Sequence, residues 1–483
     1  MTGRIRSRQC AALVLAALGL GASPALEAQA IAAPAISAPA APQNPHLAPN
    51  PNSNIHDDTW MTDAYRRPGP RRGRFITRLG ALPASLCGSL TFDRGGRIVT
   101  VCPSTVSPPA LRVIDPHSLR VIGQYTMPAG LPAPKGTPAF QNFTGGGYLF
   151  LDERDRIWTA TKSNHLFVIA ESDGGRRLRK VADYNLASVV TGQDRITSAL
   201  PDFAGRIWFV TKRDGKVGVL DPRTRAVHVL RTGEEIENSF AVGRDAVYVV
   251  TNRRMYRFSA DRRGRPRVDW AIRYRNSGIH KPSQVDAGSG ATPTILPGGL
   301  VAITDNADPM DVVVMHTDNR LRRHEPRIAC SVPVFARGAS ATENSLIGSG
   351  RSLIVENNYG YQDPFGPAAG TITTPGFARV DVNPQGTGCR LEWTNRTVRA
   401  PSVVPKLSTA TQLIYTYAQN PNPLGGQMWS WVAISARTGR TAFSVPAGSG
   451  LEANNNYAGL AIGPGATLYL GTIGGIRTLR NAP

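Results

Sequence analysis

Two short segments of the chain are near-copies of each other and carry the same polar side chains. They are Ile236-Glu237-Asn238-Ser239-Phe240 and Thr342-Glu343-Asn344-Ser345-Leu346. Two more polar segments, Gln141-Asn142-Phe143-Thr144 and Glu452-Ala453-Asn454-Asn455-Asn456-Tyr457, precede hydrophobic runs in the same way. Carboxylates and amide carbonyls are hard oxygen donors, and Ca²⁺ takes roughly six to eight of them. If the fold brings these segments together, they predict a calcium site.

Polar residues also follow two of the hydrophobic runs, in Thr304-Asp305-Asn306 and Val355-Glu356-Asn357. The predicted calcium ligands are Glu237, Asn238, Glu343, Asn344, Asp305, Asn306 and Asn455. Calcium bound there would polarise a substrate carbonyl as a Lewis acid, and Glu356 or His280 would supply acid–base catalysis. The alternative is a structural role, because Asn, Asp and Ser at strand ends also hydrogen-bond their own turns.

Motifs of other reaction classes are absent from the sequence. It contains no Gly-x-Ser-x-Gly elbow, no His-Glu-x-x-His and no Cys-x-x-Cys, the patterns that mark common hydrolases and metal centres. Its eight histidines are scattered singly, which disfavours a transition metal held by histidines. The substrate and the reaction therefore remain open.

The elements that must position these residues follow from a repeated pattern, a glycine or polar turn followed by a short β-rich run. Clear examples are Asp155-Arg156-Ile157-Trp158 and Gly205-Arg206-Ile207-Trp208. The eight runs are anchored at residues 98, 157, 207, 247, 301, 353, 413 and 468. Their mean spacing of about 53 residues is close to the period of four-stranded propeller blades.

The pattern predicts an all-β protein that forms a single β-propeller of eight four-stranded blades, with seven blades as the alternative. The last unit supplies three strands before Pro483, so the segment Phe75–Leu82 is predicted to add the fourth and close the ring. In a propeller, the loops before the innermost strands and those after the second strands open on one face. The predicted ligands should therefore converge at a central mouth.

One segment carries a family resemblance. Ala433-Ile434-Ser435-Ala436-Arg437-Thr438-Gly439-Arg440-Thr441-Ala442-Phe443 resembles the tryptophan-docking repeat of quinoprotein-type propellers, with Ser435 in place of its Asp and Phe443 in place of its Trp. The resemblance implies the superfamily fold, which is often eight-bladed. It does not imply the pyrroloquinoline quinone cofactor, because the chain has no vicinal cysteine pair and no full set of the repeats. The chain also looks loosely like gluconolactonase and streptogramin-lyase propellers.

The N-terminus predicts export. Arg4, Arg6 and Arg8 precede the apolar run Ala11–Ala22, and Ala28-Gln29-Ala30 is a cleavage site. Residues 1–30 are therefore predicted to be a signal peptide, and the mature protein to be secreted or periplasmic. Residues 31–73, rich in Ala, Pro and Asn, are predicted to be a disordered linker, whose deletion would leave the melting temperature nearly unchanged. Residues 74–483 are predicted to form the propeller.

Four cysteines remain after the predicted cleavage, and an even number in an oxidising compartment suggests two disulfides. Cys87 and Cys102 should face each other across the first hairpin of blade 1. Cys330 and Cys389 fall near the fourth strands of consecutive blades, where the outer edges approach. The predicted pairs are therefore Cys87–Cys102 and Cys330–Cys389.

The chain has 483 residues, 55 Lys+Arg, 34 Asp+Glu and a net charge of +21. The arginines are spread along the chain, and the one dense group is Arg66, Arg67, Arg71, Arg72 and Arg74. Without a basic helix or interleaved aromatics, nucleic acid is not a predicted partner, whereas an anionic envelope surface is compatible with the charge. The chain has no other apolar run of transmembrane length and is predicted to be a monomer.

Three functional hypotheses follow. The first is an exported propeller that binds a small molecule in an acidic central mouth, with a calcium-dependent hydrolase or lyase as its enzymatic form. The second is a non-catalytic envelope scaffold or protein-interaction propeller. The third, ranked below both, is a quinone-dependent dehydrogenase. An acidic, concave mouth favours the first hypothesis, whereas a mouth filled by protein favours the second.

Overall fold

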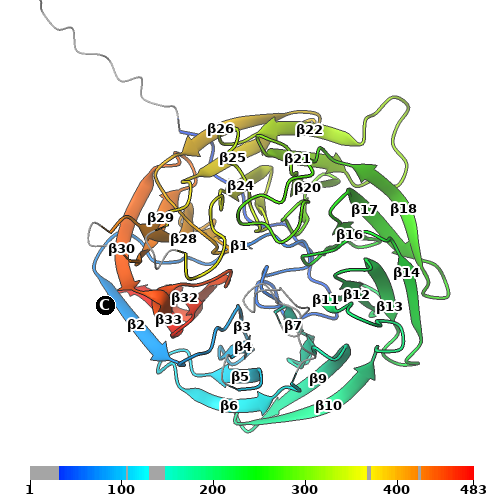
Figure 1. The fold of residues 1–483 in the computed structure, drawn as a ribbon, viewed down its shortest axis with the longest axis horizontal. Coiled ribbons are helices and arrows are strands. Elements are labelled where there is room, and N and C mark those ends of the chain that lie inside the picture. Colours follow the sequence, from blue (N-terminus) through cyan, green and yellow to red (C-terminus); the bar gives the residue numbers. More distant parts are fainter. Residues whose placement is uncertain (1–31, 105–106, 130–146, 367–370, 423–425) are drawn as a thin grey trace, which may run out of the picture. The chain divides into compact units, whose positions relative to one another are not determined.

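The computed structural model describes residues 32–104, 107–129, 147–366, 371–422 and 426–483. Within them, residues 33–483 form a unit of eight β-sheets arranged as blades of a ring (Figure 1). Two short 3₁₀ turns, η3 (Leu451–Ala453) and η4 (Pro464–Ala466), flank strands of the last blade. No helix in the described ranges is long and apolar enough to cross a membrane.

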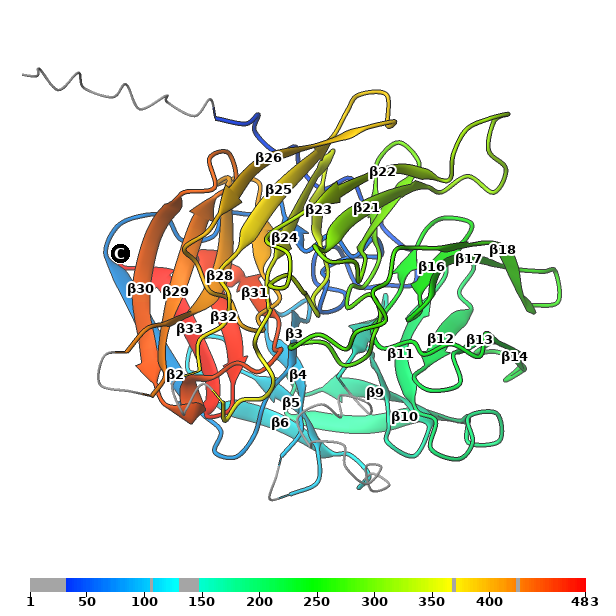
Figure 2. The ribbon, with the colours of Figure 1, turned by 45° about the horizontal axis from the view of Figure 1, so that its top comes forward.

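Each blade runs from an innermost strand near the axis to an outermost strand at the rim (Figures 1 and 2). Blade 1 consists of β3 (Ser89–Phe92), β4 (Ile98–Cys102), β5 (Ala110–Ile114) and β6 (Val121–Thr126), and blade 2 of β7 (Leu149–Leu151), β8 (Ile157–Ala160), β9 (His165–Ser172) and β10 (Arg177–Asn185). Blade 3 consists of β11 (Ile196–Pro201), β12 (Ile207–Thr211), β13 (Lys216–Leu220) and β14 (Val227–Arg231). Blade 4 consists of β15 (Ala241–Val242), β16 (Val247–Val250), β17 (Arg254–Ala260) and β18 (Pro266–Arg273).

Blades 5 to 8 continue the ring. Blade 5 consists of β19 (Thr294–Leu296), β20 (Leu300–Thr304), β21 (Asp311–His316) and β22 (Ile328–Pro333), and blade 6 of β23 (Ile347–Ser349), β24 (Ser352–Glu356), β25 (Phe377–Val382) and β26 (Cys389–Asn395). Blade 7 consists of β27 (Lys406–Ser408), β28 (Leu413–Asn420), β29 (Met428–Ser435) and β30 (Thr441–Ser449). Blade 8 consists of β31 (Leu460–Gly463), β32 (Thr467–Thr472), β33 (Gly475–Asn481) and β2 (Phe75–Ala81). A short strand, β1 (Ala64–Tyr65), adds to the inner edge of blade 7.

The eight predicted anchors all lie in the second strands of the blades, from β4 in blade 1 to β32 in blade 8. The all-β propeller with eight four-stranded blades is therefore confirmed, and the seven-bladed alternative is wrong. The predicted closure is confirmed as well. Strand β2 pairs antiparallel with β33, from Phe75 opposite Asn481 to Ala81 opposite Gly475, so the first strand of the ring completes its last blade.

In blades 2 and 3, the turn between the first and second strands is held by an aspartate. In blade 2, Asp152 Oδ1 accepts the N–H groups of Arg154 and Arg156, both at 2.9 Å. Its Oδ2 accepts Arg156 Nε at 2.7 Å and the Trp158 indole N–H at 2.8 Å. Asp202 does the same in blade 3. One carboxylate thus satisfies four donors and aligns the two strands that follow and precede it.

Both predicted disulfides are confirmed. Cys87 and Cys102 are bonded across the first hairpin of blade 1, with their Cα atoms 4.2 Å apart. Cys330 in β22 is bonded to Cys389 in β26, with a Cα separation of 5.7 Å, and so links the outermost strands of blades 5 and 6. Both separations are close to those that a disulfide requires.

The prediction that residues 31–73 form a disordered linker is wrong for the described part of this stretch. Residues 44–65, which we call the axial segment, cross the centre of the ring (Figure 1). Leu47, Ile55, Met61 and Tyr65 are buried there. The ordered propeller unit therefore begins at Ala33 and not at residue 74. Apolar contacts with the blades supply the burial that the segment cannot achieve by itself.

The axial segment is hydrogen-bonded to the inner edges of the blades. Its carbonyl groups at Thr59, Trp60, Thr62 and Asp63 accept N–H groups from blades 4, 5, 6 and 7, at 2.8 to 3.0 Å. Its Ala48 N–H donates to blade 2 at 2.8 Å. Side-chain bonds join Asn44 to Pro201 O of blade 3 and Thr91 of blade 1 to Asn52 O.

Blade 8 meets the segment by close packing. A Cβ atom at Gly459, just before β31, would lie 2.8 Å from Ile55 Cγ1, so a glycine is required at this contact. The axial segment therefore touches every blade of the ring.

Deletion of residues 33–65 tests this role. We expect a large fall in melting temperature or insoluble protein, because burial of each large apolar side chain contributes about 1.5–3 kcal/mol and several are lost together. The measurement is thermal unfolding followed by circular dichroism. The closing strand β2 stays intact in this variant, so a loss of stability reports on the axial segment. An unchanged melting temperature would restore the linker interpretation.

Candidate functional site

The loops before the innermost strands meet at one end of the ring, which we call the loop face. Tyr148, just before β7, donates its hydroxyl to Asn238 Oδ1 before β15 at 2.9 Å. Asn238 Nδ2 in turn donates to Gly290 O before β19 at 2.7 Å. Loops of blades 2, 4 and 5 are thus joined near the axis, as the propeller topology predicts.

Three carboxylates gather on this face, and we call Glu237, Asp286 and Glu343 the acidic cluster. Burial, and then Asp286 and Glu237, raise the pKa of Glu343 well above its usual range. Burial, and then Glu237 and Glu235, raise the pKa of Asp286 to about 8. Burial also raises the pKa of Glu237, which Lys212 Nζ contacts at 2.8 Å. Sequence reasoning had not included Asp286, although it lies in the loop between β18 and β19 that also contains His280.

A second polar group lies in the wall of blade 6. Asn344 Nδ2 donates to Glu356 Oε1 and, at 2.8 Å, to Val403 O. Asn358 Nδ2 donates to the same Glu356 oxygen at 3.0 Å. Glu356 Oε2 has no hydrogen-bond partner in the part of the chain that the structure describes, and burial raises the pKa of Glu356 to about 8. Glu356 is therefore largely a neutral carboxyl group at pH 7.

Other predicted ligands bond to their own loops. Asp305 Oδ1 accepts the N–H groups of Ala307 at 3.0 Å and Asp311 at 2.7 Å, and burial raises the pKa of Asp305 to about 7. Asn306 Nδ2 donates to Asn276 and to Ile279 O, and Asn455 Nδ2 donates to Ala458 O at 3.4 Å. These contacts match the structural alternative.

The predicted calcium ligands do not form one cluster. In the ranges that the structure covers, no three His, Cys, Asp or Glu side chains are grouped as a metal ion requires, and calcium stays a prediction. His280 is exposed, and its Nε2 is bonded to Gln284 O. The segment Gln141–Thr144 lies outside the described residues.

The most deeply buried charges lie where the axial segment meets blade 7. Lys406 Nζ contacts Asp63 Oδ1, Ile55 O and, at 3.3 Å, Asp57 Oδ2. Burial opposes the charge on Lys406, but Asp57 and Asp63 raise its pKa. Burial alone would raise the pKa of Asp63, but Lys406 and His56 outweigh this effect and lower it. Lys406 and Asp63 are therefore an ion pair inside the ring.

Ser345, His56 and Asp63 are also in contact, yet they do not form a catalytic relay. His56 Nδ1 lies 3.0 Å from Asp63 Oδ2 and 3.1 Å from Ser345 Oγ, and Ser345 Oγ donates to Asp63 Oδ2. In a serine hydrolase, the Asp and Ser bond to opposite nitrogens of the His. Here both bond to Nδ1, while the buried Nε2 has no partner among the described residues. The arrangement therefore differs from the triad of a serine hydrolase.

Sequence reasoning missed this ion-pair site because averaging composition over residues 31–73 hid its second half. The stretch from His56 to Tyr65 contains Asp57, Asp58, Trp60 and Met61, a denser mix of charged and large apolar residues than the Ala- and Pro-rich stretch before it. That shift in composition was the available signal.

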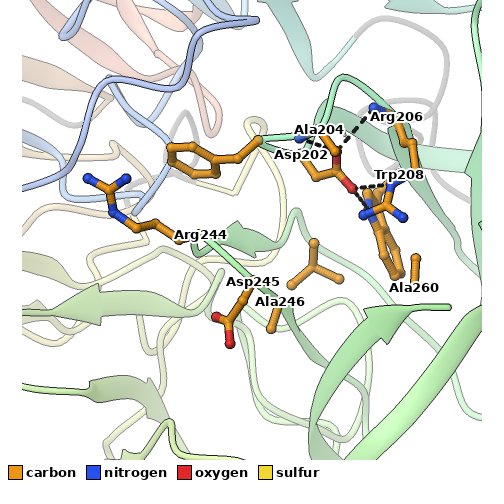
Figure 3. A pocket seen from close by; sticks show the side chains of 10 residues that line it. Asp202, Ala204, Arg206, Trp208, Arg244, Asp245, Ala246 and Ala260 are labelled. Atoms are coloured by element: carbon orange, nitrogen blue, oxygen red, sulfur yellow. Dashed lines mark hydrogen bonds and ion pairs between the residues drawn. The ribbon is translucent and has the colours of Figure 1, made fainter. Parts of the chain in front are cut away.

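The axis of the ring is occupied by the protein itself. On the loop face, Tyr457 of blade 8 donates its hydroxyl to Ser283 O before blade 5, at 2.7 Å, so loops of blades that are not neighbours meet there. The axial segment crosses the ring and bonds to the inner edges of its blades. A cavity of about 230 Å³ lies elsewhere, between blades 3 and 4, lined by Phe203, Trp208 and Arg244 among others (Figure 3).

No family model matches the chain, and no curated protein matches it significantly. Among solved structures, it is similar to quinohemoprotein alcohol dehydrogenase from Comamonas testosteroni, at a TM-score of 0.54 and 11% identity over 89% of this chain and 81% of that one. It is also similar to Sqt1 from Saccharomyces cerevisiae, at a TM-score of 0.52 and 12% identity over 86% of this chain and 100% of that one. A streptogramin B lyase matches at a TM-score of 0.40 and 11% identity over 88% of this chain and 100% of that one. The resemblance to quinoprotein-like propellers is therefore confirmed for the fold alone.

The raised pKa of Glu356 predicts a pH-dependent stability. Between its ordinary value of 4.5 and about 8, the folded state holds a proton that the unfolded chain has released. The contribution of this group therefore falls as pH rises through that window. The Glu356→Gln variant does not lose stability in this way, because the amide does not titrate. The difference in the free energy of unfolding, variant minus wild type, should therefore increase by about 1 kcal/mol or more between pH 6 and 9.

Urea denaturation at a series of pH values measures this difference. The exposed Glu452 on the same face provides a matched control, and Glu452→Gln should follow the wild-type curve. If Glu356→Gln also runs parallel to wild type, the carboxyl group titrates at an ordinary pKa and the interpretation is wrong.

Proposed function

We propose that this protein is a non-catalytic interaction propeller that works as a scaffold outside the cytoplasm. The observation that carries the proposal is the filled axis. A propeller that acts on a small molecule needs an open mouth for it, and here residues 44–65 occupy the ring and bond to blade after blade. Such a protein has its outer surfaces left for binding.

The polar groups near the axis support this conclusion. The contact of Ser345 and Asp63 with one nitrogen of His56 differs from the triad of a serine hydrolase. Asp305, Asn306 and Asn455 are engaged in their own loops. These are the contacts expected of groups that hold a structure together.

Export is part of the proposal. The two disulfides favour an oxidising compartment, and Arg4 to Ala30 read as a signal peptide. A secreted or periplasmic location follows, with the envelope as the place of action.

Native-state hydrogen exchange tests whether the axis stays filled. The N–H groups of Val242, Ile295, Gly348 and Leu407 donate to the axial segment. We expect them to exchange only through global unfolding, at the same free energy as the N–H groups of the second strands, such as Ile303.

The second strands serve as the internal control, because their bonds lie within a blade. If the four amides exchange through a local opening of far lower free energy while Ile303 stays protected, the axial segment leaves the ring. The channel would then be available to a ligand, and the scaffold proposal would give way to the small-molecule hypothesis.

Calcium binding on the loop face is a second candidate function, favoured by the repulsion within the acidic cluster. Glu237 raises the pKa of Asp286, and both raise the pKa of Glu343; protons or a cation relieve such repulsion. An extracellular protein meets Ca²⁺. Because the described side chains are not grouped as a metal ion requires, Glu237, Asp286 and Glu343 would have to move together to supply its oxygen ligands.

A calcium titration of the melting temperature tests this candidate. Binding to the native state alone should raise the melting temperature, and a chelator should lower it. Glu343→Gln should abolish the calcium shift, whereas Glu452→Gln should keep it. No shift in the wild type would remove the metal site and leave the scaffold proposal intact.

A further inference from the structure

The end of the ring opposite the loop face carries the turns between first and second strands and between third and fourth strands. We call it the turn face. It also includes Arg71–Arg74, which lie beside the chain end because Asn481 bonds to Arg71. Turns of this type must be polar, and in this chain they are built largely with arginine.

Six exposed arginines lie in the third turns of three consecutive blades. Exposed side chains there include Arg223 in blade 3, Arg262 and Arg263 in blade 4, and Arg320, Arg322 and Arg323 in blade 5. We call these six residues the arginine sector. Arg327, at the base of the blade 5 turn, lies 4.5 Å above the ring of Trp270 in blade 4, so this turn lies against the neighbouring blade.

The acidic residues of these turns offset only part of the charge of the sector. Asp221 Oδ1 accepts the N–H of Arg223 at 2.8 Å. Asp261 accepts the N–H groups of Arg263 and Arg265, and also Arg265 Nε at 2.8 Å. Asp221 Oδ1 also lies 3.7 Å from Nε of Arg223, and the blade 5 turn contains Asp318 and Glu325. The six exposed arginines of the sector still outnumber these four acidic residues.

The cavity between blades 3 and 4 borders the sector. Its lining includes Arg206 and Arg244, the carboxylates of Asp202 and Asp245, and Ala260 (Figure 3). Ala260 immediately precedes the turn that bears Arg262 and Arg263. Arg206 is bonded to Asp202, whereas Arg244 is exposed and lies over the Phe203 ring at 5.7 Å.

We propose that the arginine sector, with the exposed Arg244 beside it, docks the propeller on an anionic phospholipid surface. The proposal rests on the scaffold function and names its partner. Six guanidinium groups spread over three blade tips match an extended array of phosphates. Among the described residues, no exposed large apolar side chain lies in these turns, so the attachment is electrostatic and does not insert into the bilayer.

Nucleic acid is the poorer match. Binding of single strands uses exposed aromatic rings on which bases stack, and Trp270, beside the sector, is instead covered by Arg327. Duplex binding uses an element that enters a groove, and short turn tips spread over three blades provide no such element.

Sedimentation with phosphatidylglycerol-containing vesicles tests the proposal. The full chain should bind these vesicles at low salt, fail to bind phosphatidylcholine vesicles, and dissociate at high salt. We call the sector variant the protein in which all six arginines of the sector are replaced with Gln. It should bind these vesicles at least about tenfold more weakly than wild type, because each basic residue contributes separately. Arg244→Gln alone should give a smaller loss.

A matched control removes the same charge from the loop face. It replaces Arg213, Arg231, Arg253, Arg273, Arg337 and Arg396 with Gln, all exposed, and should bind within about threefold of wild type. Equal losses in the two variants would mean that net charge alone drives binding and would overturn the docking site. Binding of DNA or heparin at salt concentrations where vesicles are not bound would assign the sector to a polyanion instead.

The two proposals fail separately. Loss of vesicle binding in the wild type leaves the hydrogen-exchange result on the axial segment unchanged. Both six-residue variants should retain the wild-type melting temperature within a few degrees, since none of the six sector side chains is buried. A sector variant that unfolds would be replaced by Arg320→Gln/Arg322→Gln/Arg323→Gln, for which a partial loss of binding is expected and no loss would overturn the proposal.

Discussion

The inner edges of the blades impose the constraint on which the rest of this structure depends. Each blade has its innermost strand at the axis, and the N–H and C=O groups on the free edge of that strand need hydrogen-bond partners. The axial segment supplies many of these partners, with carbonyls that follow blades 4 to 7 in order. The buried pair of Lys406 and Asp63 then locks the segment to blade 7. Residues 44–65, which precede the first blade in the sequence, therefore lie at the centre of the ring.

This arrangement determines the electrostatics near the axis. With the segment in place, Asp57, Asp63 and Glu356 lie away from water, so each must be paired or hold a proton. Asp63 is paired with Lys406, and Glu356 is held neutral by its surroundings. Buried ion pairs contribute little net stability, but a lost partner is costly. The pair therefore favours one seating of the segment over others.

The topology also places different charged groups at the two ends of the ring. Loops before the innermost strands bring Glu237, Asp286 and Glu343 together on the loop face, whereas the arginine sector lies on the turn face. The loop face carries exposed arginines as well, so the acidic cluster and the arginine sector, and not the net charge of +21, distinguish the two ends. A scaffold with such a polarity would attach through one face and leave the loop face and the blade edges available to other molecules.

The sequence by itself determined the blades. Each second strand follows a local turn signal, and the pairing of antiparallel neighbours placed Phe75–Ala81 in blade 8 and matched all four cysteines correctly. It also indicated that Glu237 and Glu343 share a face, but not which residues would surround them. Only the tertiary structure decided the fate of residues 44–65, because their order comes from partners such as Lys406 that lie hundreds of residues away. Composition measures what a segment can bury alone, and this segment is stable only inside a ring that it helps to build.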